Sequence, residues 1–203
     1  MATVDLPRPD VPAPVAVVRD FVNTTDHETG SDDLATPVAL AAYLFQAGLT
    51  PSLARASNSE LDLAHRLRAG LREVLEEHDG VGTEPSGLGA VLEQLDVCLT
   101  WDATGPVLTT SASGVAGGLA RIGMAAHTMA VRGLWGRLKI CSSDECGWAY
   151  FDHSKNRSRS WCEYGCGNKV KTRSYRARRR TAQAAQSAPA ATSSPSTPIP
   201  SRI

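Results

Sequence analysis

Apolar side chains repeat at helical spacing through most of the first two thirds of the chain. The first amphipathic helix is predicted to begin at Thr36–Pro37 and to end at Gly48. The second is predicted to begin at Ser57 or Ser59 and to end near His78, because its leucines recur every three or four residues. The pattern therefore predicts helices that each bury one face in a shared core.

The rest of this region adds shorter elements. Residues 88–95 predict a short third helix, and residues 97–101 and 106–110 predict the two strands of a hairpin. A fourth helix is predicted from about Val115 to Trp135, and its glycines and alanines favour close packing against a neighbour. In the second helix, Arg66, Arg68 and Arg72 fall on the face expected to be exposed to water. The predicted fold class is mainly α, with a small β-hairpin.

The two ends of the chain differ from this region in composition. Four prolines within residues 1–14 predict a flexible, extended lead-in, so that the helical domain covers residues 15–136. Residues 181–203 consist largely of Ala, Gln, Ser, Thr and Pro without periodicity, which predicts a disordered tail. The start of the chain lacks the basic region and long apolar run of a secretory signal, and charges interrupt the most apolar stretch. We therefore expect a cytoplasmic protein that makes no membrane contact.

The charges of the chain are divided by position. The totals of 21 basic and 21 acidic residues cancel. Residues 1–136 nevertheless carry 17 acidic and 8 basic side chains, whereas residues 137–180 carry 12 basic and 4 acidic ones. This division predicts an acidic globular part joined to a part that binds polyanions.

Four of the five cysteines lie close together in the sequence. They are Cys141, Cys146, Cys162 and Cys166, in the pattern C-x4-C, fifteen intervening residues and C-x3-C. Two close pairs at this separation are typical of a structural zinc site, and the finger-like spacing favours zinc over an iron–sulfur cluster. If the second pair is helical, its cysteines share one face and Cys162 lies at the helix start. The sequence therefore predicts one structural Zn2+ ion.

The segment between the cysteine pairs completes a small domain at residues 137–180. The predicted elements follow the order of a treble clef. They are a loop with the first cysteine pair, a strand at residues 147–152, a turn at 153–156 and a helix with the last ligands. His153 could replace one ligand, although a histidine in a turn is more often a surface residue. Four thiolates leave no position open for water, which argues against a catalytic zinc. Cys98, outside the cluster, is expected to be a small buried apolar residue.

A strongly basic helix is predicted after Cys166. Lys169, Arg173, Arg176 and Arg180 share one face at spacings of four, three and four residues. Such a run is often only a solvated face, but here the metal site would anchor its first turn. Lysine and arginine contacts to phosphates are the sequence-independent part of nucleic-acid binding. The candidate nucleic-acid contacts are Arg157, Arg159, Asn168, Lys169, Lys171, Arg173, Arg176, Arg178, Arg179 and Arg180.

The same cysteine segment resembles the CGNR zinc-finger family. The matching residues are the cysteine pairs with their flanking glycines and tryptophans, the stretch 151–159, and Gly167-Asn168-Lys169 after the last cysteine. Lys169 stands where the family name implies arginine, and Ser160 stands where a second arginine is common. Lysine keeps the charge but lacks the planar group that binds phosphate or guanine in two places. The resemblance implies that the four cysteines are the zinc ligands.

The N-terminal part resembles the ABATE domain, which commonly precedes this finger. The shared stretches are Asp20-Phe21-Val22-Asn23-Thr24 and Leu34-Ala35-Thr36-Pro37. This resemblance implies a bacterial, stress-linked transcription regulator with a mostly helical N-terminal domain. Asn23 and Thr24 belong to the one polar cluster that could line a pocket for a small-molecule effector. Helix caps and loop turns favour the same residue types for local reasons.

Three functions fit these features. The first is a DNA-binding transcription regulator, the second an RNA-binding module, and the third a protein-interaction adaptor with a purely structural zinc site. One finger offers a short recognition footprint, which favours a homodimer or a DNA-bound partner. The sequence shows no phosphate-binding glycine loop, His-Glu metal pair or nucleophile elbow, so we do not expect an enzyme.

Overall fold

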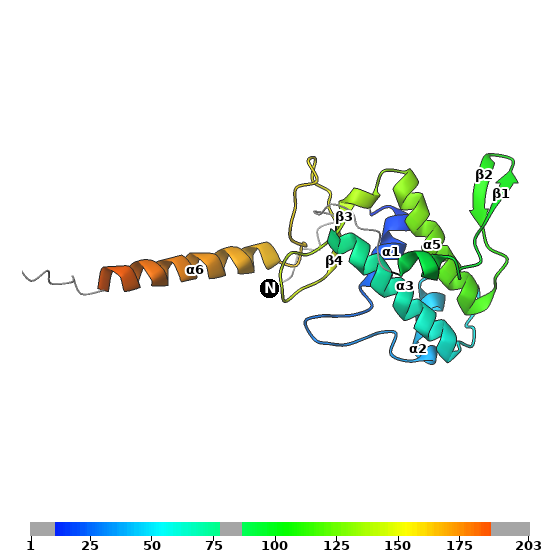
Figure 1. Cartoon of the computed structure of the whole chain (residues 1–203), viewed down its shortest axis with the longest axis horizontal. Coiled ribbons are helices and arrows are strands. Elements are labelled where there is room, and N and C mark those ends of the chain that lie inside the picture. Colours follow the sequence, from blue (N-terminus) through cyan, green and yellow to red (C-terminus); the bar gives the residue numbers. More distant parts are fainter. Residues whose placement is uncertain (1–10, 78–86, 188–203) are drawn as a thin grey trace, which may run out of the picture. The chain divides into compact units, whose positions relative to one another are not determined.

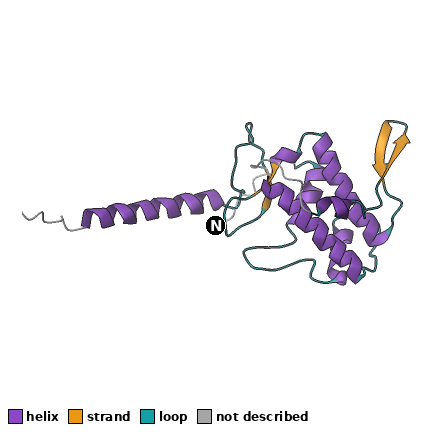
Figure 2. Cartoon of the chain, in the orientation of Figure 1, coloured by secondary structure: helices purple, strands orange, loops and turns teal. Residues whose placement is uncertain are grey.

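The protein is mainly α-helical in the computed structural model, which describes residues 11–77 and 87–187 (Figures 1 and 2). The helices are α1 (Ala13–Val22), α2 (Pro37–Gln46), α3 (Asn58–Glu76), α4 (Leu88–Leu92), α5 (Gly114–Val131) and α6 (Cys166–Ser187). The strands are β1 (Cys98–Asp102), β2 (Gly105–Thr109), β3 (Leu138–Ile140) and β4 (Ala149–Phe151). They form two antiparallel pairs, β1–β2 and β3–β4. The predicted fold class is confirmed.

Two compact units make up the chain. The first ends at Gly167 and the second begins at Asn168, within α6. The four helices expected in residues 15–136 and the four clustered cysteines belong to the first unit. Among the described residues, no helix combines the length and the apolar character needed to cross a bilayer.

The starts of α2 and α3 are fixed by local capping, as the sequence predicts. The Thr36 side chain accepts a hydrogen bond from the amide of Ala39 at 3.1 Å, and Pro37 occupies the first turn. Ser57 and Glu60 form a reciprocal capping box at the start of α3. Each cap satisfies backbone amides that would otherwise lack partners at a helix start.

Helix α1 was not predicted. The expected lead-in ends earlier, because residues 13 and 14 already belong to α1, while residues 1–10 lie outside the described part of the chain. A proline in the first turn does not interrupt a helix, since the amide that it lacks has no helical partner there. Val15, Val18 and Phe21 are fully buried, so α1 belongs to the centre of the core.

Helix α5 packs closely through its glycines, as expected, but it is shorter than predicted. A Cβ atom on Gly118 would lie 3.0 Å from Cδ1 of Leu44, so a larger residue would force the Leu44 side chain of α2 to move. The helix ends at Val131, because Gly133 takes a φ of +64° that stops it. A short 3-10 helix follows at Trp135–Arg137.

The β3–β4 pair belongs to the core of the helical part. Leu138, Ala149 and Phe151 are buried in one cluster with the leucines of α2, α3 and α5. Figure 1 shows the two strands beside α1 and the end of α3, and β4 contacts α1 while β3 contacts α3. The segment that carries the cysteines is therefore attached to the helical core by packing as well as by the chain.

Two further expectations are wrong. Cys98 is exposed, because the β1–β2 hairpin extends from the helices and all five residues of β1 are exposed. Residues 181–187 continue α6 instead of starting a disordered tail, and residues 188–203 lie outside the described part. Alanine and glutamine, which dominate at 182–186, are good helix formers, so the helix can extend beyond its basic segment.

Candidate metal centre and basic helix

The four clustered cysteines converge on one point. Their sulfur atoms all lie within 4.8 Å of one another. The sulfurs of Cys146 and Cys162 are 3.7 Å apart, and those of Cys162 and Cys166 are 3.6 Å apart. A tetrahedral zinc with bonds of about 2.3 Å separates its sulfurs by about 3.8 Å. The geometry therefore fits one structural zinc ion, as predicted.

The four cysteines that could hold the ion come from three short segments. Cys141 follows β3, and Cys146 lies in the tight loop that leads to β4. Cys162 lies in a loop and not at a helix start, because a turn at residues 163–165 separates it from α6. Cys166 is the first residue of α6, so that helix carries one ligand instead of the two predicted.

Backbone amides point at three of the sulfurs. The amides of Ser143, Trp148 and Tyr164, each two residues after a cysteine, donate to the sulfurs of Cys141, Cys146 and Cys162. The amide of Cys162 also donates to the sulfur of Cys141 at 3.5 Å. Such donors stabilise thiolates, the form that binds a metal.

The pKa values of these thiols follow burial and hydrogen bonding. Burial raises the pKa of Cys141, but hydrogen bonds from the backbone amides of Cys162 and Ser143 and from the neighbouring thiols together outweigh that effect and hold the pKa below the ordinary value. Burial raises the pKa of Cys146 to about 11 and that of Cys162 further. The raised pKa values favour the protonated thiols. A bound divalent cation reverses this preference, since a thiol that coordinates a cation loses its proton. The site is thus built for thiolates that a cation stabilises.

Histidine is not part of the cluster. The ring of His153 packs edge-on against Phe151 with centroids 4.7 Å apart. Cys141, Cys162 and Cys166 are each only 4% exposed, and four thiolates fill a tetrahedral zinc. A zinc ion held here would stabilise the loops and would leave no position for a substrate.

A buried carboxylate organises the loop that carries Arg157 and Arg159. The Asp152 side chain is fully buried and accepts hydrogen bonds from the amides of Ser154 at 2.8 Å and Arg159 at 3.0 Å. The ammonium of Lys139 lies 3.2 Å from the same carboxylate and donates to the carbonyls of both arginines. Burial raises the pKa of Asp152, but these donors outweigh it and bring the pKa to about 2, so the group is ionised at neutral pH.

We expect Asp152→Asn to destabilise the zinc-loaded protein by about 3 kcal/mol, because it removes the buried charge that the partly buried Lys139 ammonium and the two amides require. Urea unfolding followed by tryptophan fluorescence measures this change. Asp144→Asn, at an exposed carboxylate in the same region, is the matched control and should leave the midpoint unchanged. Equal midpoints for both variants would contradict the assigned role of Asp152.

Two side chains of the helical part hold the cysteine segment. The Asn23 amide donates to the carbonyl of Ala149 at 2.9 Å and accepts from its amide at 2.7 Å, so it pairs with β4 like a neighbouring strand. Both terminal nitrogens of Arg72 donate to the carbonyl of Gly147 at 2.8 Å. No feature of the sequence indicates the second contact, since the helical pattern places Arg72 on the face expected to be exposed to water.

The predicted effector residues have structural partners. Thr24 is buried, donates to the carbonyl of Phe21 at 2.7 Å and accepts from Arg68 at 2.9 Å. Arg68 also binds both oxygens of Asp32, so its expected exposure is wrong as well. Asn23 and Thr24 do line a cavity of about 440 Å³ together with Tyr43. The polar side-chain atoms of Asn23 and Thr24 are nevertheless hydrogen-bonded to other residues of the chain. An effector role for these two residues stays a prediction.

Asn23→Ala is expected to lower the free energy of unfolding by about 2 kcal/mol, because two hydrogen bonds to the backbone of Ala149 are lost. Thermal unfolding of the zinc-loaded protein measures the loss. Asn58→Ala, in the exposed first turn of α3, should change the stability by less than about 0.5 kcal/mol. Similar effects of the two changes would show that the contact with β4 contributes little.

Helix α6 presents the predicted basic residues to solvent. Its seven basic side chains, at positions 169, 171, 173, 176, 178, 179 and 180, are all exposed, as is Asn168. No acidic residue occurs between Cys166 and Ser187. The guanidinium of Arg179 lies 6.0 Å from the centroid of the Tyr175 ring. The described part of the second unit, residues 168–187, is therefore a cationic helix.

Family comparisons agree with the resemblances noted in the sequence. Residues 16–136 match the model of the ABATE family, described as "Putative stress-induced transcription regulator". Residues 137–179 match the model of the CGNR zinc finger. No curated protein matches the chain. Both family descriptions concern regulation or a zinc finger, and neither describes an enzyme.

Proposed function

The chain belongs to the ABATE family, whose description is "Putative stress-induced transcription regulator", and carries a CGNR zinc finger at residues 137–179. From this premise we propose that it is a bacterial cytoplasmic regulator that binds duplex DNA. The contacts are made by α6 and by the loop that carries Arg157 and Arg159. The family match supports regulation, and the charge of α6 supports nucleic acid as the target.

The uninterrupted positive charge of α6 is the observation that carries the proposal. Like charges at spacings of three and four residues repel along a helix, and a polyanion relieves that repulsion. A helix of 22 residues is about 33 Å long, and the major groove of B-DNA is wide enough to admit a helix. The exposed basic side chains are long enough to contact phosphates on either side of the groove.

The basic side chains lie on two sides of α6. Lys169, Arg173, Arg176 and Arg180 form one face. Lys171 and Arg178, seven residues apart, project from about the opposite side. A helix in the major groove has one phosphate backbone on each side, so this distribution suits contacts with both strands. These contacts would not by themselves select a sequence.

Zinc would contribute by holding the start of α6. Cys166 is both one of the four clustered cysteines and the first residue of the helix, so an ion held by the cluster would fix its first turn. Bound zinc supplies the folding energy that a small segment with little core of its own lacks.

The proposal is tested by titrating labelled duplex DNA with the zinc-loaded full chain at several salt concentrations. We expect a linear fall of the logarithm of affinity with the logarithm of salt concentration. An affinity that does not change with salt would contradict the proposal. Competition with structured RNA separates the alternatives, since preferential displacement by RNA would make RNA the target.

A further inference from the structure

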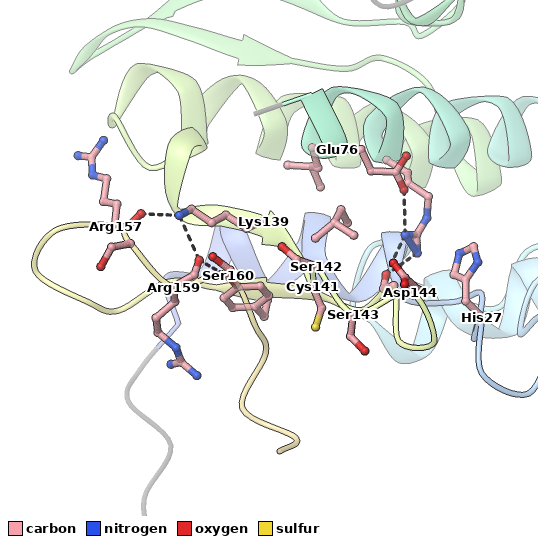
Figure 3. A pocket seen from close by; sticks show the side chains of 16 residues that line it. His27, Glu76, Lys139, Cys141, Ser142, Ser143, Asp144, Arg157, Arg159 and Ser160 are labelled. Carbon is pink, nitrogen blue, oxygen red and sulfur yellow. Dashed lines mark hydrogen bonds and ion pairs between the residues drawn. The ribbon is translucent and has the colours of Figure 1, made fainter. Parts of the chain in front are cut away.

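A cavity and a hairpin of the first unit take no part in holding the fold together. The cavity, of about 500 Å³, lies where α3 meets the cysteine segment (Figure 3). The guanidinium groups of Arg157 and Arg159 extend there to opposite sides of their loop, and Lys139 is bound to carbonyls of the same loop. No set of donors therefore converges on one ligand. The β1–β2 hairpin, in contrast, presents an ordered apolar surface.

The hairpin has one apolar and one polar face. The register sets Leu99 opposite Leu108 and Trp101 opposite Pro106, and side chains of opposed residues lie on the same face of a sheet. Thr100 lies on the other face. An antiparallel sheet usually packs its apolar face on a core. Here Trp101 is 79% exposed and Leu99 is 71% exposed, because the hairpin extends from the helices (Figure 1).

The two edges of the hairpin differ in their hydrogen-bonding groups. Pro106 has no N–H, so it cannot exchange hydrogen bonds with Trp101. The bonded pairs of the ladder are therefore the alternate ones, such as Thr100 and Val107.

The amides of Leu99 and Trp101 consequently point away from β2, along the outer edge of β1. On the outer edge of β2, the corresponding position at Pro106 lacks a donor, and proline at an edge hinders strand pairing. Within the described ranges, no strand pairs with the outer edge of β1. An edge with open amides and apolar side chains is a template for another strand.

A second copy of β1 matches this edge. Leu99 and Trp101 lie on either side of Thr100, so a two-fold axis at Thr100 sets Leu99 of each copy against Trp101 of the other. The outward amides and carbonyls of the two antiparallel strands then face each other. Each copy thus supplies both the apolar side chains and the backbone groups that the other lacks.

The charges of the hairpin are compatible with this pairing. Asp102 is the one charged residue between Cys98 and Thr109. About an axis at Thr100, the two copies of Asp102 lie about 14 Å apart along the strands, which exceeds the screening length of about 8 Å at physiological salt. A basic partner would find a single carboxylate on this surface. An apolar, self-complementary partner fits it better.

We propose that β1 strands of two copies pair antiparallel about Thr100, so that the hairpin is the surface of a homodimer. The product is a four-stranded sheet in the order β2–β1–β1–β2, and a hairpin alone is only marginally stable. The inference goes beyond the proposed function, since the hairpin belongs to the helical part and its pairing requires no DNA.

The buried area predicts a reversible dimer. Each Trp101 can lose about 200 Å² of apolar surface to the contact and each Leu99 about 100 Å², which gives about 600 Å² for two copies. Stable complexes bury about 1,200–2,000 Å². We therefore expect a dimer that forms in the micromolar range and dissociates on dilution.

The dimer is tested by sedimentation velocity of the zinc-loaded full chain, without DNA, from low micromolar to nearly millimolar concentration. Trp101→Thr should weaken dimerisation about tenfold, because the axis repeats each lost contact, while threonine still suits a strand. Leu53→Thr, at a leucine that is 65% exposed outside the hairpin, is the matched control and should dimerise as the parent does.

The register is tested by cysteine cross-linking in a glutathione buffer, in the background Cys98→Ser. In the central pair, the Cα atoms of the two Thr100 residues would lie about 4.5 Å apart, which a disulfide can bridge. Thr100→Cys should therefore give a covalent dimer on a non-reducing gel. Thr104→Cys, at the exposed turn, is the control, because its two copies lie at opposite ends of the paired strands.

A monomer over the whole concentration range would overturn the proposal. A dimer that Trp101→Thr leaves unchanged, or that Leu53→Thr weakens equally, would do the same. A dimer that Thr100→Cys does not cross-link, or that both cysteine variants cross-link equally, would overturn the pairing about Thr100. A dimer that binds no DNA leaves the inference standing without the proposed function, and a monomer that binds DNA does the reverse.

Discussion

Cys162→Ser is expected to abolish the binding of one zinc ion per chain and to unfold the segment between β3 and α6. The sulfur of Cys162 lies 3.7 Å from that of Cys146 and 3.6 Å from that of Cys166, so its loss breaks both close pairs. Structural zinc contributes about 10–16 kcal/mol to small domains, and this segment has no comparable substitute. Elemental analysis and thermal unfolding measure the two effects.

The exposed thiol Cys98 supplies the matched control. It lies in β1 on the hairpin, away from the four-cysteine cluster. Cys98→Ser should keep one zinc per chain and leave the unfolding midpoint unchanged. One zinc per chain in Cys162→Ser would contradict the ligand assignment.

Loss of the metal should also destabilise the helical part. Leu138 and Phe151 lie in its core, and Asn23 and Arg72 bind the backbone of the cysteine segment. Removal of these contacts costs a few kcal/mol, which corresponds to a decrease of about 10 °C in the unfolding midpoint of a chain of this size. Most of the helical circular dichroism should remain, because α2, α3 and α5 keep their mutual packing.

The sequence predicted the features that depend on neighbouring residues. The caps at Thr36 and Ser57 act within three residues, and the spacing of the cysteines reflects the short reach of one metal ion. The sequence does not predict helix α1, because prolines usually indicate a break in regular structure, although a helix accepts proline in its first turn. The sequence pattern identifies an element only where the pattern is compatible with a single structure.

Contacts between distant residues left no such signal. Asn23 and Ala149 are 126 residues apart, and Arg72 and Gly147 are 75 apart. Arginine on the polar side of an amphipathic helix usually faces water, so nothing in the sequence distinguished Arg72 from Arg66. The role of Asp152 likewise depends on Lys139, whose position is fixed by the pairing of β3 with β4.

The double variant Arg173→Ala, Arg176→Ala is expected to weaken DNA binding and to reduce its dependence on salt. If each arginine contacts one phosphate, the slope of log affinity against log salt concentration becomes shallower by about 1.8. The loss should be similar for all duplex sequences, because phosphates carry no sequence information. Fluorescence anisotropy with two unrelated duplexes over a range of salt concentrations measures both effects.

A change of charge alone must be separated from the loss of specific contacts. The control Arg55→Ala, Arg132→Ala removes two exposed arginines from the helical part and changes the net charge equally. Alanine has a higher helix propensity than arginine, so a loss of affinity in the α6 variant would not arise from a broken helix. An unchanged slope in the α6 variant, or an equal change in the control, would show that α6 does not contact the phosphates. DNA binding would then have to depend on Arg157, Arg159 or another surface.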